Sequence, residues 1–193
     1  MKVLILRGSP REGQNTDTLV EAFIKGMTTN SKIEIISIRL REKDVAPCTA
    51  CGFCKKTKAC TIKDDMQMIY SHIESSRMIV VATPLYVNNV SAYTKSMMDR
   101  CQIYWNSKYI LKDPIIPLDS KKRIGVVLST AGSTYPKQFE GLRSTCDLFF
   151  KGVHATYECE LLITGTDKVS VINRKDILKE AEEAGRDMTK KLE

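Results

Sequence analysis

The feature that most constrains this chain is a run of four cysteines with the pattern C-x2-C-x2-C-x5-C, formed by Cys48, Cys51, Cys54 and Cys60. Three thiols at successive spacings of three can converge from one tight loop, and a fourth can complete a tetrahedral set. Soft thiolates gathered in this way suit an iron–sulfur cluster or a zinc ion. The fold must therefore allow one short loop to bring four sulfur atoms together.

A second motif, GSPREGQNT at residues 8–16, follows an apolar stretch and opens a helical pattern. The free amides and the dipole of a helix N-terminus favour an anion, and Ser9, Thr16 and Arg11 add hydroxyl and guanidinium donors. We expect this segment to bind a phosphate, with contacts from Ser9, Arg11, Gln14, Asn15 and Thr16. The alternative is that Thr16 or Thr18 only caps the helix, with Thr18 and Glu21 as a capping box. In the phosphate interpretation the acidic Glu12 and Asp17 should point to solvent.

The bulk composition predicts one soluble globular domain spanning residues 1–193, with 42% hydrophobic and 27% charged residues. No apolar run approaches the roughly 20 residues that a membrane span needs. The amino terminus is typical of a first strand rather than a signal peptide. We therefore expect a cytoplasmic protein, with no membrane partner, whose thiols stay reduced. The net charge is +7, but the basic residues are scattered, so we expect no nucleic-acid partner.

Apolar runs alternate with helical patterns along the chain, which predicts an α/β fold with a parallel sheet covered on both faces. Five crossover-linked strands favour the flavodoxin-like doubly wound order 2-1-3-4-5. The cysteine loop, about residues 47–61, follows the second strand. The predicted strands, taken as buried, are Val3–Leu6, Ile33–Ile38, Met78–Ala82, Ile124–Ser129 and Tyr157–Ile163, and the predicted helices cover about 19–27, 66–73, 90–100, 137–150 and 173–192.

In such a sheet, ligands bind at the carboxyl ends of the strands where the strand order reverses. The loops after the third and fourth strands should therefore meet the phosphate loop at one edge. We expect these loops to contact a flavin through Pro84, Leu85, Tyr86, Val87, Asn88, Thr130, Ala131 and Gly132. The cysteine loop should emerge at the same edge, on the order of 10–20 Å from the flavin, because neighbouring strands lie about 4.8 Å apart.

Three sets of residues resemble the NADPH-dependent FMN reductase group, and within it the iron–sulfur flavoproteins. They are G-S-P-R-x-G-x-N-T, then P-C-x-A-C-G-x-C with its later cysteine and D-D-M, and then P-x-Y followed by Lys95 and Asp99-Arg100. The resemblance implies FMN as cofactor and a 4Fe-4S cluster held by Cys48, Cys51, Cys54 and Cys60. It further implies a ferredoxin-like electron donor, which a basic chain suits, and a small acceptor such as oxygen, peroxide or a quinone-like molecule. It also implies a homodimer or homotetramer.

Several alternatives stay open. The cysteines could hold zinc, form a redox disulfide or carry no ligand at all. The protein could be an NAD(P)H-dependent FMN or quinone reductase without a cluster, or an electron carrier without catalytic turnover. We assign no side chain as a general acid or base.

Other residues favour structural roles. Cys101, Cys146 and Cys159 are interpreted as small buried hydrophobic residues. Asp99 and Arg100 are interpreted as anchors of a helix end. Tyr104–Lys122 is predicted to be the longest irregular stretch, and either an oligomer interface or a plain surface connection would explain its aromatic residues.

Overall fold

Five parallel strands form a single sheet in the order β2-β1-β3-β4-β5, which confirms the predicted fold class and strand order. The structure is a computed structural model that describes residues 1–28, 33–118 and 122–192. Val3 of the inner strand β1 lies opposite Ile35 on one side and Met78 on the other. The strands are β1 (Lys2–Arg7), β2 (Glu34–Arg39), β3 (Met78–Pro84), β4 (Ile124–Thr130) and β5 (Thr156–Ile163).

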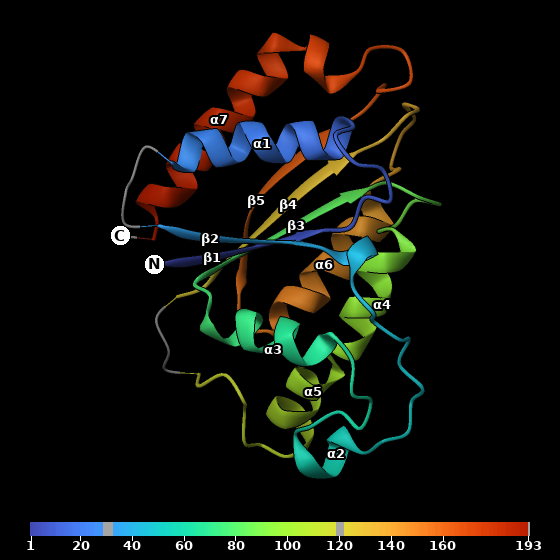
Figure 1. Cartoon of the computed structure of the whole chain (residues 1–193), viewed down its shortest axis with the longest axis vertical. Helices are drawn as coiled ribbons and strands as arrows, with labels where there is room; N and C mark the ends of the chain where they lie inside the picture. The colour runs from blue at the N-terminus through green and yellow to red at the C-terminus, as the bar shows by residue number, and fades with distance from the viewer. Residues whose placement is uncertain (29–32, 119–121, 193) are drawn as a thin grey trace.

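Helices cover both faces of the sheet (Figure 1). One face carries α1 (Asn15–Met27) and α7 (Lys175–Lys190), and the opposite face carries α3 (Met66–Ser75), α4 (Ala92–Arg100) and α6 (Glu140–Gly152). The short helices α2 (Cys54–Thr57) and α5 (Gln102–Trp105) lie beyond α3, farther from the sheet. The remaining helical segments are a π-helical turn η2 (Asn106–Ile110) and the 3-10 turns η1 (Leu40–Glu42) and η3 (Val171–Asn173).

Two apolar cores follow from this arrangement, one on each side of the sheet. Leu19, Val20 and Phe23 of α1 pack in the core under α1 and α7, as their spacing predicts. Met66, Ile69 and Ile73 of α3 belong to the opposite core. The central strands β1, β3 and β4 are buried almost throughout, whereas the edge strands β2 and β5 are only half-buried. The prediction that all five strands are buried is therefore wrong for the two edges, where each strand has only one neighbour.

The stretch that begins at Tyr104 is helical at its start, which corrects the prediction of an irregular segment. Helix α5 continues into the π-helical turn η2, and the first proline of the stretch comes only at Pro114. Ile103 and Tyr104 are buried, so this turn of chain packs against the core rather than passing over it. Residues 119–121 of the predicted stretch lie outside the described residues. Within the described ranges, no helix has the length and apolar character needed to cross a membrane.

Helices α1 and α7 cross at two glycines, so their backbones lie in direct contact. A Cβ added at Gly26 would collide with the backbone oxygen of Glu182, and one added at Gly185 would collide with the backbone oxygen of Phe23. Because both obstacles are backbone atoms, neither helix can accommodate a methyl group by moving a side chain alone.

We expect Gly185→Ala to lower the free energy of unfolding by about 1–3 kcal/mol, the usual cost of overpacking. The matched control is Gly152→Ala at the end of α6, where an added Cβ has nothing within 4 Å. That control should be neutral or stabilising by up to about 1 kcal/mol, because alanine favours the helix. Urea denaturation followed by circular dichroism measures both, and equal stability of the two variants would contradict the close helix contact.

Candidate cofactor sites

A polar cleft of about 280 Å³ lies at the carboxyl end of the sheet, between the loops that follow β1, β3, β4 and β5. Most of the residues predicted to contact a flavin line it. From the predicted set these are Ser9, Arg11, Gln14, Asn15, Thr16, Pro84, Leu85, Tyr86, Thr130 and Gly132. The structure thus brings the phosphate loop and the two later loops together at one edge, as the strand order requires.

The N-terminus of α1 opens into this cleft without a capping side chain. Gln14 occupies the N-cap position, and its side chain forms no capping hydrogen bond. Thr18 lies inside α1, where its hydroxyl donates to the carbonyl of Gln14. Since Thr18 is not the N-cap residue, the capping-box alternative is wrong. The hydroxyls of Thr16 and Thr130 lie 2.8 Å apart and join the phosphate loop to the end of β4. An uncapped helix start beside hydroxyls and Arg11 is chemically suited to a phosphate group.

Asp17 is buried, which corrects the expectation that it points to solvent. Its carboxylate accepts a hydrogen bond from the amide of Gly13 at 2.9 Å and pairs with Arg39 at 2.9 Å and Arg7 at 3.5 Å. The two arginines neutralise the carboxylate, so it can hold the turn at Gly13 without opposing an anion. Gly13 has a φ of +65°, a conformation that suits glycine.

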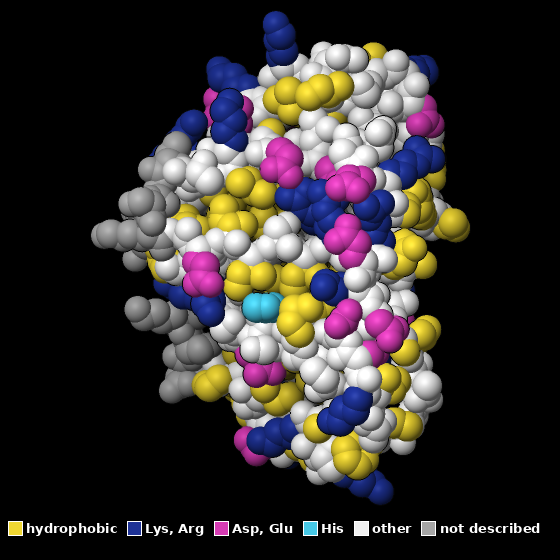
Figure 2. Space-filling model, viewed as in Figure 1, with side chains coloured by type: hydrophobic (Ala, Val, Ile, Leu, Met, Phe, Trp, Pro, Cys, Tyr) yellow, Lys and Arg dark blue, Asp and Glu magenta, His cyan; other side chains and the backbone are white. Residues whose placement is uncertain are grey.

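Glu12 does point outward, as expected, and pairs with Arg41 at 2.6 Å. Figure 2 shows basic and acidic side chains beside one another near the end of β2, where Arg39 and Arg41 pair with Glu12.

Three of the predicted flavin contacts do not line the cleft. Val87 and Asn88 form the tip of a tight turn in which Tyr86 and Asn89 exchange backbone hydrogen bonds at 2.9 Å. Both tip residues have left-handed φ angles, of +49° and +58°, and the Val87 side chain is fully exposed. Ala131 is 3% exposed and packs in the core below α6. The turn thus places Tyr86 at the cleft and directs its own tip away from it.

Ser133, Thr166 and Asp167 also line the cleft and were missed by the sequence analysis. The segment 165–167 follows β5 and pairs with the loop after β4, because the amides of Thr166 and Asp167 donate to the carbonyls of Ala131 and Gly132 at 3.1 and 3.2 Å. The signal that could have found it is the strand order itself. It places the end of β5 beside the end of β4.

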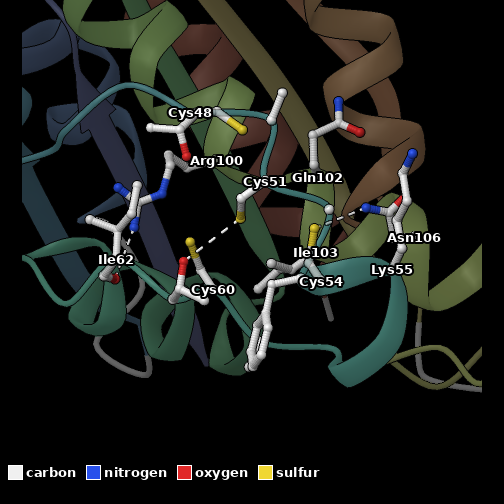
Figure 3. Close-up of a pocket in the computed structure, with 16 residues that line it drawn as sticks. Cys48, Cys51, Cys54, Lys55, Cys60, Ile62, Arg100, Gln102, Ile103 and Asn106 are labelled. Atoms are coloured by element: carbon white, nitrogen blue, oxygen red, sulfur yellow. Dashed lines mark hydrogen bonds between the residues drawn. The ribbon is translucent and has the colours of Figure 1, made fainter.

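A second cavity, of about 250 Å³, is lined by Cys48, Cys51, Cys54 and Cys60. Figure 3 shows these cysteines facing the hollow from different sides, with Arg100, Gln102, Ile103 and Asn106 completing its wall. All four are free thiols. Among residues 1–28, 33–118 and 122–192, no three Cys, His, Asp or Glu side chains converge closely enough to hold a single metal ion.

Polar groups point at two of these sulfur atoms. The side-chain amide of Asn106 donates to Cys54 Sγ at 3.0 Å, and the hydroxyl of Thr61 lies 3.7 Å from Cys51 Sγ. Hydrogen bonds from the Phe53 amide and from Thr61 lower the pKa of the Cys51 thiol. Free thiols with donors directed at them, around a space several times the roughly 30 Å³ share of one water molecule, fit a multi-atom group bound through sulfur.

Helix α4 runs from the loop after β1 to the cysteine cavity. At its start, the hydroxyl of Ser91 donates to the carbonyl of Gly8 at 2.6 Å, and Thr94 lies so close to Gly8 that any Cβ there would collide with it. At its end, Arg100 lines the cysteine cavity. A nine-residue helix is about 13 Å long, so roughly that distance along its axis separates the contact with Gly8 from Arg100. The close approach at Gly8 is therefore to α4.

The remaining cysteines are packing residues. Cys101 and Cys146 are buried, and burial raises the pKa of both thiols, that of Cys146 to about 12. Both therefore stay neutral, as expected for small buried hydrophobic residues. Cys159 is only half-buried on the edge strand β5.

Comparison with known proteins agrees with this geometry. Residues 1–148 match the family described as NADPH-dependent FMN reductase. An iron–sulfur flavoprotein from Methanosarcina thermophila is 31% identical over 147 residues, which cover 76% of this chain and 72% of that protein. The chain belongs to the iron–sulfur flavoproteins of the NADPH-dependent FMN reductase family. An iron–sulfur flavoprotein from Archaeoglobus fulgidus is 39% identical over 97 residues, 50% of this chain and 49% of that protein, so this match spans only about half of either chain.

Solved structures share the fold at lower identity. An NAD(P)H:quinone oxidoreductase from Methanothermobacter marburgensis superposes with a TM-score of 0.72 at 21% identity, covering 97% of this chain and 96% of that one. Family membership identifies the chain as an oxidoreductase with a flavin redox function and FMN as its cofactor. The cleft fits FMN on its own chemistry, because an uncapped helix start and a guanidinium suit the phosphate while Tyr86 offers a flat ring at the rim.

We expect Arg11→Ala to raise the Kd for FMN about tenfold, since a hydrogen bond to a charged group contributes about 1.5–3 kcal/mol. Fluorescence titration of the FMN-free protein measures this change. The control is Lys25→Ala at the other end of α1, where the lysine pairs with Glu182 on the surface and should leave the Kd unchanged. An unaltered affinity in Arg11→Ala would contradict the phosphate role of this loop.

Proposed function

We propose that this flavoprotein also holds a 4Fe-4S cluster at Cys48, Cys51, Cys54 and Cys60 and transfers electrons from a ferredoxin-like protein to a small acceptor. When bound, the cluster would exchange single electrons and FMN one or two, which is the chemistry that such a transfer requires. The observation that carries the proposal is the cavity that all four cysteines line, with Asn106 and Thr61 directed at its sulfur atoms.

The protein side chains have binding and orienting roles in this proposal. Ser9, Arg11 and the start of α1 would hold the FMN phosphate, Tyr86 would lie against the flavin, and the loops after β4 and β5 would close the other side of the cleft. The thiols would act as ligands once deprotonated. No side chain is required to move a proton, because the redox chemistry belongs to the cofactors.

The surface around the cysteine cavity supports an acidic protein donor. Lys55 and Lys56 are exposed on α2, Lys55 lines the cavity, and Phe53 beside them is 41% exposed. Positive charge around an apolar contact would steer an acidic ferredoxin-like protein to this face. We further propose a homodimer or homotetramer, and oxygen, peroxide or a quinone-like molecule as the acceptor.

A second candidate is an NAD(P)H-dependent FMN or quinone reductase whose cysteines hold no cluster. One relative favours it: a Bacillus subtilis protein described as a putative NAD(P)H-dependent FMN-containing oxidoreductase is 26% identical over 163 residues. The two candidates differ in their electron donor. Anaerobic turnover with reduced ferredoxin, compared with NADPH and NADH, distinguishes them, and activity with the nicotinamides alone would favour the second candidate.

We expect Cys51→Ala to lose most of its iron and acid-labile sulfide while retaining FMN, because three thiolates hold a cluster less tightly than four. The measurement is iron, sulfide and flavin content after anaerobic purification. The control is Cys159→Ala, which removes a thiol from the edge strand β5 and should keep full iron. Wild-type protein that contains FMN but neither iron nor sulfide, even after reconstitution, would overturn the cluster proposal.

A further inference from the structure

Arg100 carries a permanent charge in a place where charge is costly. It is the last residue of α4, and its side chain is 0% exposed. Taking a guanidinium out of water costs several kcal/mol unless its hydrogen bonds and its charge are satisfied. From the sequence, Arg100 is expected to anchor its own helix end. Its hydrogen bonds instead run to a segment more than thirty residues earlier in the chain.

The partners of Arg100 flank the cysteine loop on both sides. Nη1 donates to the carbonyl of Ala46 at 2.9 Å, just before Cys48, and Nη2 donates to the carbonyl of Ile62 at 3.2 Å, just after Cys60. Both groups also donate to the Asp64 carboxylate, at 2.6 and 3.1 Å. One guanidinium therefore holds both ends of the segment that contains all four thiols.

Asp64 completes this closure. It accepts two further hydrogen bonds, from the amides of Ala46 and Met66, each at 3.0 Å. Although burial opposes the charged form, the hydrogen bonds from Arg100 and the two amides hold the pKa of the Asp64 carboxyl below its usual range. The hydroxyl of Tyr70 on α3 donates to the carbonyl of Arg100 at 2.9 Å and fixes the arginine backbone.

Arg100 also lines the cysteine cavity itself. Cys60, the last of the four cysteines, lines the same cavity. The Nε of Arg100 is buried and, within the described parts of the chain, has no hydrogen-bond partner. A buried N–H donor without an acceptor is costly, and here it belongs to a residue in the wall of a cavity that four sulfur atoms share.

We propose that Arg100 is the positioning residue of the cysteine site: it closes the loop around the four thiols and donates Nε–H to sulfur within the cavity. This inference rests on the cluster proposed above. Closing both ends of the loop removes conformations that would otherwise have to be lost on binding. A hydrogen bond to cluster sulfur would raise the reduction potential. Lysine cannot replace this residue, because an ammonium group lacks the planar fork that reaches separate acceptors.

The test compares Arg100→Lys with wild type and with Lys95→Met. Lys95 lies on the same helix but forms an exposed pair with Asp99. We expect Arg100→Lys to bind FMN with unchanged affinity. It should release iron to a chelator about tenfold faster than wild type, as is usual when a residue that supports metal ligands is replaced. The reduction potential of its remaining cluster should be more negative. Lys95→Met should match wild type. In cluster-free protein, trypsin should cut after Lys55 and Lys56 faster in Arg100→Lys than in either reference.

If Arg100→Lys does not fold, the double variant Arg100→Met with Asp64→Leu tests the role of Arg100. Removing both charges leaves neither one buried without its partner. The double variant should keep FMN and lose iron. An Arg100→Lys or double variant that retains iron, releases it at the wild-type rate and keeps the wild-type potential would overturn the role of Arg100. Wild-type protein without iron would instead overturn the cluster proposal, so the two failures are distinguishable.

Discussion

The buried ion pair between Arg100 and Asp64 is the interaction on which the second cavity depends. The segment between Ala46 and Ile62 contains one short helix, α2, and no strand, so few regular backbone hydrogen bonds fix its conformation. The ion pair supplies what the segment lacks, because the two side chains bond to the backbone on both sides of it. Both side chains are almost fully buried, at 0% and 4% exposure, so solvent competes little for these hydrogen bonds.

Helix α4 places this ion pair relative to the loop after β1, which lines the polar cleft. Its N-cap residue, Ser91, donates to the carbonyl of Gly8, and its last residue is Arg100. Because α4 packs on the sheet through Met97 and Met98, a shift at either end would have to move buried side chains. The spacing between the cleft and the cysteine cavity is therefore set by a rigid element rather than by a loop.

The sequence predicted the sheet well because its signals are local and repeated. Apolar runs mark the strands, the helical spacing of Met66, Ile69 and Ile73 marks a core face, and the strand order follows from the crossovers. The phosphate loop was equally accessible, since its donors lie within nine residues. What the sequence could not indicate are partners that only the fold creates. Asn106 reaches Cys54, and Arg39 neutralises Asp17, across separations that no spacing rule covers.

The order of residues along the chain has a consequence for biogenesis. Cys48, Cys51, Cys54 and Cys60 leave the ribosome well before residue 100, and Arg100 can bond to Ala46 and Ile62 only after α4 has packed on the sheet. During synthesis the four thiols are thus presented on an unfastened segment, open to oxidation or to competing metal ions. Loading of the proposed cluster therefore belongs after the synthesis of α4, when Arg100 can hold both ends of the cysteine segment.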